Sequence, residues 1–288
     1  MMEKNFFAKF HGLGNDYICL DEDWIDFNLD TEAVKTICDV HYGVGSDGIL
    51  LKTHSSKADF GLRIFNPDGS EAQKSGNGLR IFAKFLYDYG YTMKREFTVG
   101  TKGGIVKARI EELVNGRASV ITVDMGKAVF RAKDVPVLCD TEECIGKKIK
   151  VNDREFEINC VSVGNPHCVI IVDELDENVV RKYGAKIENL DIFPDRINVQ
   201  FAKVISPELV EIRIWERGAG YTLASGSSSC AVASVMVKRG LAERNLSVKM
   251  PGGILKIQVD ESWNIRMTGE VQEICSGHLS PELTEQFI

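Results

Sequence analysis

The spacing of apolar residues predicts two helices of similar length, one in each half of the chain. They cover about Gly76–Tyr89 and Gly226–Lys238, and each is followed by a glycine, Gly90 or Gly240. A glycine just past the last turn is typical of a helix end, because it adopts left-handed backbone angles without strain. A serine stands directly before each predicted helix.

Segments rich in β-branched and aromatic residues lie around these helices. Leu62–Phe65 precedes the first helix, and residues 97–110 and 246–259 follow the first and second helices, each interrupted by a Gly-Gly pair. Runs of this kind separated by glycine turns are typical of strands. The pattern predicts an α/β (α+β) fold of two pseudo-symmetric lobes, each a mixed β-sheet or barrel wrapped around a central helix.

The two halves also match each other in sequence at an offset of 150 residues. The strand residues Leu62–Asn66 align with Ile212–Glu216, and Ser75-Gly76 aligns with Ser225-Gly226. Further matches join Gly14-Asn15 to Gly164-Asn165, Gly90 to Gly240, and, after a slip of one residue, Gly103–Lys107 to Gly252–Lys256. Several blocks in one register indicate an internal duplication. The alternative is two unrelated lobes that share common α/β turn residues.

The duplication suggests where the lobes divide. We expect residues 1–124 with 280–288 to form an N-terminal lobe and residues 125–279 to form a C-terminal lobe. The two copies would face each other across one active-site cleft of amino-acid size.

Composition excludes several classes of protein. The chain has 35 basic and 42 acidic residues and no basic block, so nucleic acid is not an expected partner. The first ten residues lack a signal-peptide core, and no apolar run approaches the roughly 18 residues of a membrane helix. We therefore expect a cytoplasmic protein with a small-molecule partner and no membrane contact.

The eight cysteines do not form a metal-binding pattern. None lies in a CxxC pair, so neither a zinc ribbon nor another metal site is predicted. Reduced, buried thiols are the expected state in a cytosolic chain.

The serines before the two helices indicate an anion site. The first N–H groups of a helix have no partner within the helix, so they bind anions such as a carboxylate. Inverting an amino acid at Cα requires a base on one face and an acid on the other. A nearly two-fold site therefore suits racemisation.

Several motifs resemble the diaminopimelate epimerase family, and the similarity spans the whole chain. In chain order they are Gly12–Tyr17, Gly43–Gly48, Asn66–Glu71 with Ser75–Arg80, Gly164–His167, Asn198, and Trp215–Gly220 with Ser225-Gly226. The resemblance implies a cofactor-independent epimerase in which two thiols flank Cα. It also implies that members are often homodimers.

This sequence departs from the family at both thiol positions, which hold Ser75 and Ser225. A serine hydroxyl is a much weaker proton acceptor than a thiol. Lys74, Tyr221 and the triple serine 227–229 also differ from the usual family residues, which favours a natural branch over deliberate replacement of two cysteines. Cys168 and Cys230 are weaker candidates for displaced thiols.

The resemblance assigns roles to individual residues. Ser75 and Ser225 would be the acid and base, activated by Lys74, His167 or Glu216, although both serines could simply cap their helices. His167 and Glu216 match positions that contact the reacting amine. The reacting carboxylate would bind Gly76, Asn77, Gly226 and Ser227. The distal end of the substrate would bind Asn15, Asn66, Asn165, Asn198 and Arg217, whose planar guanidinium suits a carboxylate.

Three functions are compatible with this sequence. The first is interconversion of LL- and meso-diaminopimelate, a precursor of lysine and peptidoglycan. The second is the same chemistry on another amino acid, because Tyr221 and the triple serine alter the predicted pocket wall. The third is an amino-acid-binding protein without catalysis.

Overall fold

The computed structural model describes residues 4–287 as two compact units. Unit 1 contains Met1–Val123 and Gly269–Ile288, and unit 2 contains Asp124–Thr268. Residues 1–3 and 288, which the sequence analysis assigned to the first lobe, lie outside the described residues.

Unit 1 is a mixed sheet with two longer helices and a short C-terminal one. Its strands are β1 (Phe6–Gly12), β2 (Asn15–Asp21), β3 (Ile49–Thr53), β4 (Phe60–Phe65), β5 (Glu71–Ala72), β6 (Glu96–Thr101), β7 (Gly104–Val114), β8 (Arg117–Lys127) and β18 (Gln272–His278). Its helices are α1 (Thr31–Cys38), α2 (Gly76–Asp88), α5 (Pro281–Thr284) and the 3-10 turn η2 (Glu285–Phe287).

Unit 2 contains the same kinds of element. Its strands are β9 (Ile145–Val151), β10 (Arg154–Ser162), β11 (Pro166–Ile171), β12 (Asn198–Ser206), β13 (Leu209–Glu216), β14 (Gly220–Thr222), β15 (Asn245–Met250), β16 (Gly253–Val259) and β17 (Asn264–Glu270). Its helices are the 3-10 turn η1 (Ala132–Asp134), α3 (Glu177–Glu188) and α4 (Gly226–Lys238). The unit boundaries fall within β8 and β17.

The strands pair in the same order in both units. In unit 1, β1 is antiparallel to β2, β2 is parallel to β3, β3 is antiparallel to β4, and β4 is parallel to β6. Unit 2 repeats this order: β10 is antiparallel to β11, β11 is parallel to β12, β12 is antiparallel to β13, and β13 is parallel to β15. In the sequence, α2 lies between β4 and β6 of unit 1, and α4 lies between β13 and β15 of unit 2.

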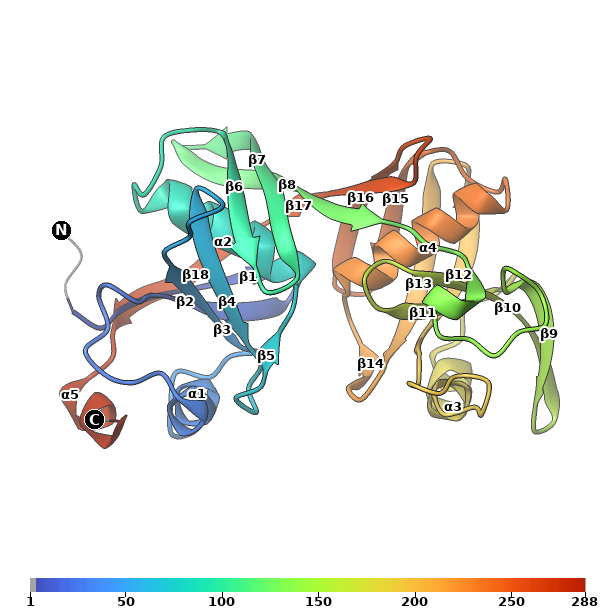
Figure 1. The fold of residues 1–288 in the computed structure, drawn as a ribbon, viewed down its shortest axis with the longest axis horizontal. Helices are drawn as coiled ribbons and strands as arrows, with labels where there is room; N and C mark the ends of the chain where they lie inside the picture. Colours follow the sequence, from blue (N-terminus) through green and yellow to red (C-terminus); the bar gives the residue numbers. More distant parts are fainter. Residues whose placement is uncertain (1–3, 288) are drawn as a thin grey trace. The chain divides into compact units, whose positions relative to one another are not determined.

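Each of these helices is the buried centre of its unit. Figure 1 shows α2 among the strands of unit 1 and α4 among those of unit 2. α2 contacts β1, β2 and β7, and α4 contacts β10, β11, β12, β15 and β16. All residues of α2 from Gly76 to Leu86 are buried, including Arg80 and Lys84, and most residues of α4 are buried too. Both helix predictions are confirmed to within one residue.

The two central helices end in the same way. Gly90 and Gly240 have φ of 77° and 67°, which is the left-handed region. The next N–H group then reaches back to a carbonyl in the last turn, from Tyr91 to Leu86 at 3.0 Å and from Leu241 to Met236 at 2.9 Å. This is the glycine-dependent helix end that the sequence predicts.

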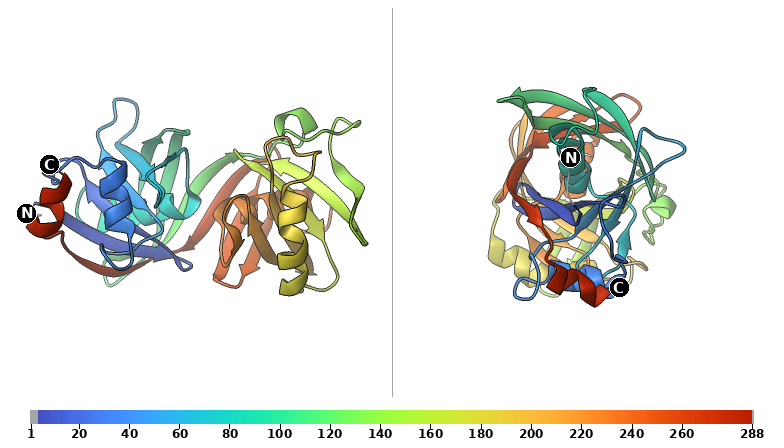
Figure 2. Two further views of the ribbon diagram at one scale, coloured as in Figure 1. Left: turned by 90° about the horizontal axis from the view of Figure 1, so that it is seen from below. Right: turned by 90° about the vertical axis from the view of Figure 1, so that its left-hand side faces the viewer.

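The end of the chain packs with unit 1. β18 pairs antiparallel with β1, so residues 269–279 lie in unit 1 although the sequence analysis placed them in the C-terminal lobe. Leu283 and Phe287 then pack against the core formed by α1, β2 and β3. Figures 1 and 2 show α5 beside α1. Strand pairing over more than 250 residues cannot be recognised from local sequence.

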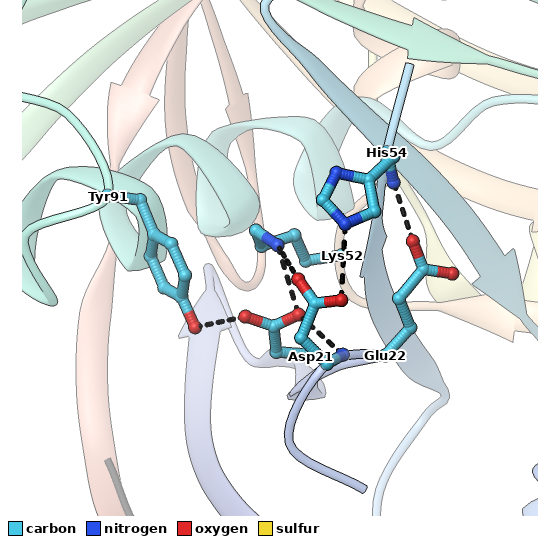
Figure 3. A network of polar contacts seen from close by, with 6 residues as sticks. Asp21, Glu22, Lys52, His54 and Tyr91 are labelled. Carbon is cyan, nitrogen blue, oxygen red and sulfur yellow. Dashed lines mark hydrogen bonds and ion pairs between the residues drawn. The ribbon is translucent and has the colours of Figure 1, made fainter. Parts of the chain in front are cut away.

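A buried ion pair lies beside this core (Figure 3). Lys52 Nζ is 3.0 Å from Asp21 Oδ1, and the Tyr91 hydroxyl donates to Asp21 Oδ2 at 2.6 Å. Asp21 and Lys52 are only 2% and 7% exposed. Their mutual contact and the Tyr91 hydrogen bond offset part of the cost of removing two charges from water.

Among residues 4–287, no helix is both long enough and apolar enough to cross a membrane.

Candidate active site

Ser75 caps the N-terminus of α2. Its backbone is extended, with φ −137° and ψ 121°, and its Oγ accepts a hydrogen bond from the Gly78 N–H at 3.0 Å. The helical ladder begins with the Leu79 N–H, which donates to the Ser75 carbonyl at 2.8 Å. The N–H groups of Gly76 and Asn77 precede that first donor, so they suit an anion in the way the sequence predicts.

The Ser75 hydroxyl has a second neighbour in Tyr17. The phenol oxygen of Tyr17 lies 3.2 Å from Ser75 Oγ, and Tyr17 is 7% exposed. The Tyr17 ring packs so closely on Gly48 that an added Cβ there would come within 2.8 Å of Tyr17 Cε1. Tight packing on glycine fixes the ring and therefore the position of its hydroxyl.

The asparagines of the unit 1 motifs divide into two groups. Asn77 Nδ2 donates to Asn15 Oδ1 at 3.1 Å, and the buried Arg80 donates to Asn77 Oδ1 at 2.8 Å. Asn15 in turn donates to Asp47 at 2.9 Å. Asn66 instead donates to Ser70 Oγ at 2.9 Å within its own turn. The structure therefore joins Asn15 to the start of α2 but gives Asn66 a local partner.

Ser225 caps α4 as Ser75 caps α2. Its φ is −151° and its ψ is 124°, and its Oγ accepts from the Ser228 N–H at 3.4 Å. The Ser227 hydroxyl is also 3.4 Å from Ser225 Oγ. The first intrahelical donor is the Ser229 N–H, at 3.1 Å from the Ser225 carbonyl. The N–H groups of Gly226 and Ser227 therefore have the same position as those of Gly76 and Asn77.

Glu216 is the acidic residue among the predicted site residues of unit 2. It ends β13, immediately before the turn that leads to β14 and α4. Burial raises the pKa of the Glu216 carboxyl above its usual value, and a hydrogen bond with Ser225 opposes part of that rise. A carboxylate in contact with a hydroxyl can accept its proton, and a raised pKa makes it a stronger base.

His167 is fully buried and neutral. Its side chain is 0% exposed, and Nε2 lies 3.0 Å from Asn165 Oδ1. Burial lowers the pKa of His167 to about 3, against an opposing interaction with Gln200 and with a further contribution from the charge of Arg217. The imidazole is therefore a fixed neutral group across ordinary pH. This favours orienting Asn165 over exchanging protons with a substrate.

A buried polar pair lies on β12 and α4 of unit 2. Gln200 and Ser228 are both 0% exposed, and Gln200 Nε2 lies 3.0 Å from Ser228 Oγ. This bond ties Gln200 to the first turn of α4, whereas Gln200 Oε1 and His167 Nδ1 are buried without a hydrogen-bond partner among the described residues. Neither Gln200 nor Ser228 was given a role by the sequence.

Asn198 connects the strand of His167 to Arg217. Asn198 faces His167 in the parallel register of β11 and β12, and its Nδ2 donates to the Pro166 carbonyl at 2.8 Å. Its Oδ1 accepts from the Arg217 N–H at 3.0 Å. The Arg217 guanidinium donates to the Asp195 carbonyl at 2.8 Å. Both side chains are thus held in place by backbone groups.

The candidate displaced thiols are inaccessible. Cys168 and Cys230 are both 0% exposed, inside the β11 strand and the α4 helix. A thiol without access to a substrate cannot exchange its α-proton.

Tyr17 lies near Ser75, although the sequence predicted no role for it. It is the last residue of the Gly12–Tyr17 motif. The available signal was strand periodicity, since side chains two apart on a strand point to the same face. Asn15 and Tyr17 have this spacing on β2, and both contact the start of α2.

Comparison with known proteins shows which family the chain belongs to. A model of the family described as diaminopimelate epimerase matches residues 7–131 and 159–274. The chain belongs to the diaminopimelate epimerase family. This confirms the resemblance read from the motifs.

Relatives in the family align over nearly their whole length. Diaminopimelate epimerase 2 of Nostoc sp. is 46% identical over 278 residues, which is 96% of each chain. Diaminopimelate epimerase of Acetivibrio thermocellus is 40% identical over 95% of this chain and 98% of its own. The enzyme of the same name from Methanococcus maripaludis is 39% identical over 95% and 99%.

Solved structures show the same fold at low sequence identity. A hydroxyproline epimerase from Agrobacterium vitis has a TM-score of 0.71 at 13% identity, covering 99% of this chain and 95% of its own. A probable proline racemase from Agrobacterium radiobacter has a TM-score of 0.69, also at 13% identity, covering 96% and 93%. The predicted fold class, helix-centred mixed α/β, is confirmed.

Proposed function

We propose that this protein is a cofactor-independent epimerase that interconverts LL- and meso-diaminopimelate. One observation carries the proposal. In each unit, the hydroxyl at the family's thiol position caps the central helix, and the helix-start N–H groups beside it suit a carboxylate. A hydroxyl at a thiol position and N–H groups that suit an anion therefore occur together twice in one chain.

The roles follow from these positions. Ser75 and Ser225 would serve opposite faces of the same α-carbon. Backbone N–H groups of Gly76, Asn77, Gly226 and Ser227 would hold its carboxylate. Asn15, Asn66, Asn165, Asn198 and Arg217 would hold the distal amino acid centre, with His167 orienting Asn165.

Glu216 supplies the strongest support for proton removal without a thiol. A serine hydroxyl is a poor base by itself, so it needs a neighbour that takes its proton. The Glu216 carboxylate contacts Ser225, and its pKa is raised by burial. We propose that Ser225 and Glu216 act together as the base.

We also propose a biological setting. The family name implies a step toward lysine and peptidoglycan precursors. The eight cysteines are free thiols in the structure, which agrees with a reducing cytoplasm. The shared order of strand pairing supports an internal duplication, and a homodimer is expected from the family resemblance.

The deciding experiment follows the α-proton. The protein is incubated with LL- and with meso-diaminopimelate in D₂O, and the Cα–H signal is measured by proton NMR. The proposal expects deuterium uptake together with inversion, and loss of both in a Ser75→Ala/Ser225→Ala variant. Tight binding of either isomer without deuterium uptake would show a binding protein instead. Exchange confined to other amino acids in a panel would show a related enzyme with a different substrate.

Restoring the thiols tests the pocket separately from the serines. A Ser75→Cys/Ser225→Cys variant should exchange the α-proton faster, because a thiol at a helix N-terminus ionises more readily than a hydroxyl. If this variant binds diaminopimelate but exchanges nothing, positions 75 and 225 do not transfer protons.

A further inference from the structure

The two serine caps differ in the group behind them. Ser225 Oγ lies 3.4 Å from the Ser227 hydroxyl and opposes part of the rise that burial causes in the pKa of the Glu216 carboxyl. Ser75 Oγ instead lies 3.2 Å from the Tyr17 hydroxyl. A carboxylate is ordinarily ionised at neutral pH, and a phenol, with an ordinary pKa of about 10, is protonated. The phenol near Ser75 therefore carries a proton at neutral pH, and the carboxylate near Ser225 does not.

Hydrogen-bond counting shows what Tyr17 allows Ser75 to do. A serine hydroxyl has one proton and two lone pairs. The Gly78 N–H, at 3.0 Å from Ser75 Oγ, occupies one lone pair. If the Tyr17 O–H donates to the other, the Ser75 proton is directed outward. The phenol can then replace that proton once Ser75 has given it away.

We propose that Tyr17 is the proton-relay residue behind Ser75, so that the unit 1 half-site delivers a proton to the α-carbon while Ser225 and Glu216 remove one. This inference rests on the proposed epimerase function. It describes the conversion of one isomer, and the other isomer reacts through the same steps in reverse, starting with Tyr17 ionised and Glu216 protonated. It also assigns a role to Tyr17, to which the family motifs give none.

The proton balance is complete. The Cα–H bond breaks, its proton passes to Ser225 Oγ, and the Ser225 hydroxyl proton passes to the Glu216 carboxylate. The electron pair stays on Cα and forms a new bond with the Ser75 hydroxyl proton. The Tyr17 proton then restores the Ser75 hydroxyl. Glu216 ends protonated and Tyr17 ionised, and exchange with water resets both.

The first test does not depend on turnover. In a Ser75→Cys background, the thiol introduced at position 75 is alkylated with iodoacetamide at a series of pH values, and its peptide is followed by mass spectrometry. A donating Tyr17 hydroxyl stabilises the thiolate, so adding Tyr17→Phe should raise the thiol pKa by about one unit. The matched control is Tyr91→Phe, which removes the buried hydroxyl bound to Asp21 and should leave that pKa unchanged (Figure 3). An equal pKa with and without the Tyr17 hydroxyl overturns the relay.

The second test separates relay from structure. For the diaminopimelate isomer whose α-proton is removed by Ser225, Tyr17→Phe should lower inversion about 100-fold. Deuterium exchange with retention should fall much less, because Glu216 and Ser225 are intact. A ratio of exchange to inversion that matches the unmodified protein would contradict the relay, since general damage lowers both rates together. Circular dichroism and thermal unfolding confirm that the variant is folded.

The two hypotheses can fail separately. If the unmodified protein neither exchanges nor inverts diaminopimelate, the proposed function fails and the thiol titration alone decides the Tyr17 contact. If it inverts diaminopimelate but Tyr17→Phe changes neither the titration nor the ratio, only the relay fails.

Discussion

Ser75 and Ser225 have nearly the same backbone conformation and the same local task. Both are extended N-caps, with ψ of 121° and 124°, and each Oγ accepts the N–H group three residues ahead. Their other neighbours differ. Ser75 Oγ lies near the Tyr17 phenol. Ser225 Oγ instead lies near the Ser227 hydroxyl and opposes part of the rise that burial causes in the pKa of the Glu216 carboxyl. Because the two serines cap their helices alike but have different neighbours, mutations can distinguish the effect of capping from the effect of proton transfer.

Ser75→Ala should lower the free energy of unfolding by about 1 kcal/mol, the usual cost of losing a cap. Turnover should fall far more than this stability loss explains. Asp30→Ala is a matched control, because Asp30 caps α1 through bonds of 3.0 Å to the Glu32 and Ala33 N–H groups. Urea unfolding and epimerisation rates measure both effects. Similar losses of turnover in the two variants would mean that Ser75 acts only as a cap.

The activity should depend on the ionisation of Glu216. Since the carboxylate form is the base and burial raises its pKa above 4.5, kcat/KM should rise with pH through that elevated pKa. Glu216→Gln should remove this acidic limb and lower turnover by about 100-fold or more. Glu211→Gln, on the same strand and paired with Arg213 at 3.1 Å, should keep the limb. If the acidic limb of the kcat/KM profile persists in Glu216→Gln, a group other than Glu216 causes it.

Stability should depend on pH through His167. The pKa of His167 is about 3 in the folded protein against an ordinary 6.5, so below pH 6.5 the unfolded chain binds a proton that the folded chain does not. Stability is therefore lost as the pH falls from 6.5 toward 3, with a slope of up to about 1.4 kcal/mol per pH unit. His167→Asn should be less stable at neutral pH but should lack this slope. If the unmodified protein and His167→Asn lose stability in parallel as the pH falls, His167 takes up its proton in the folded protein as readily as in the unfolded chain.

The Asp21–Lys52 pair should be far more important to stability than a surface pair. Lys52→Met leaves the buried Asp21 charge without its cation and should lower the free energy of unfolding by about 3–5 kcal/mol. Lys107→Met breaks the exposed pair with Glu96 at 2.7 Å and should cost at most about 1 kcal/mol. Urea unfolding of both variants decides this. Equal costs would mean that Asp21 is hydrated once Lys52 is removed.

The sequence alone predicted the features that depend on nearby residues. Helix starts at Ser75 and Ser225, helix ends at Gly90 and Gly240, and the wrapped sheet followed from capping residues, glycine positions and strand composition. These signals are local because a cap or a left-handed glycine acts within one helical turn. The family motifs, read together, added the fold and a list of site residues.

The tertiary structure decided which distant groups meet and what their surroundings do to them. Tyr17 reaches Ser75 across 58 positions, β18 pairs with β1 from the other end of the sequence, and burial lowers the pKa of His167 and keeps it neutral. None of these has a local signature, because contact and desolvation depend on how strands and helices pack and not on the order of neighbouring residues. A serine in the sequence is only a potential acid or base, and the packed groups around it determine whether it can hold or move a proton.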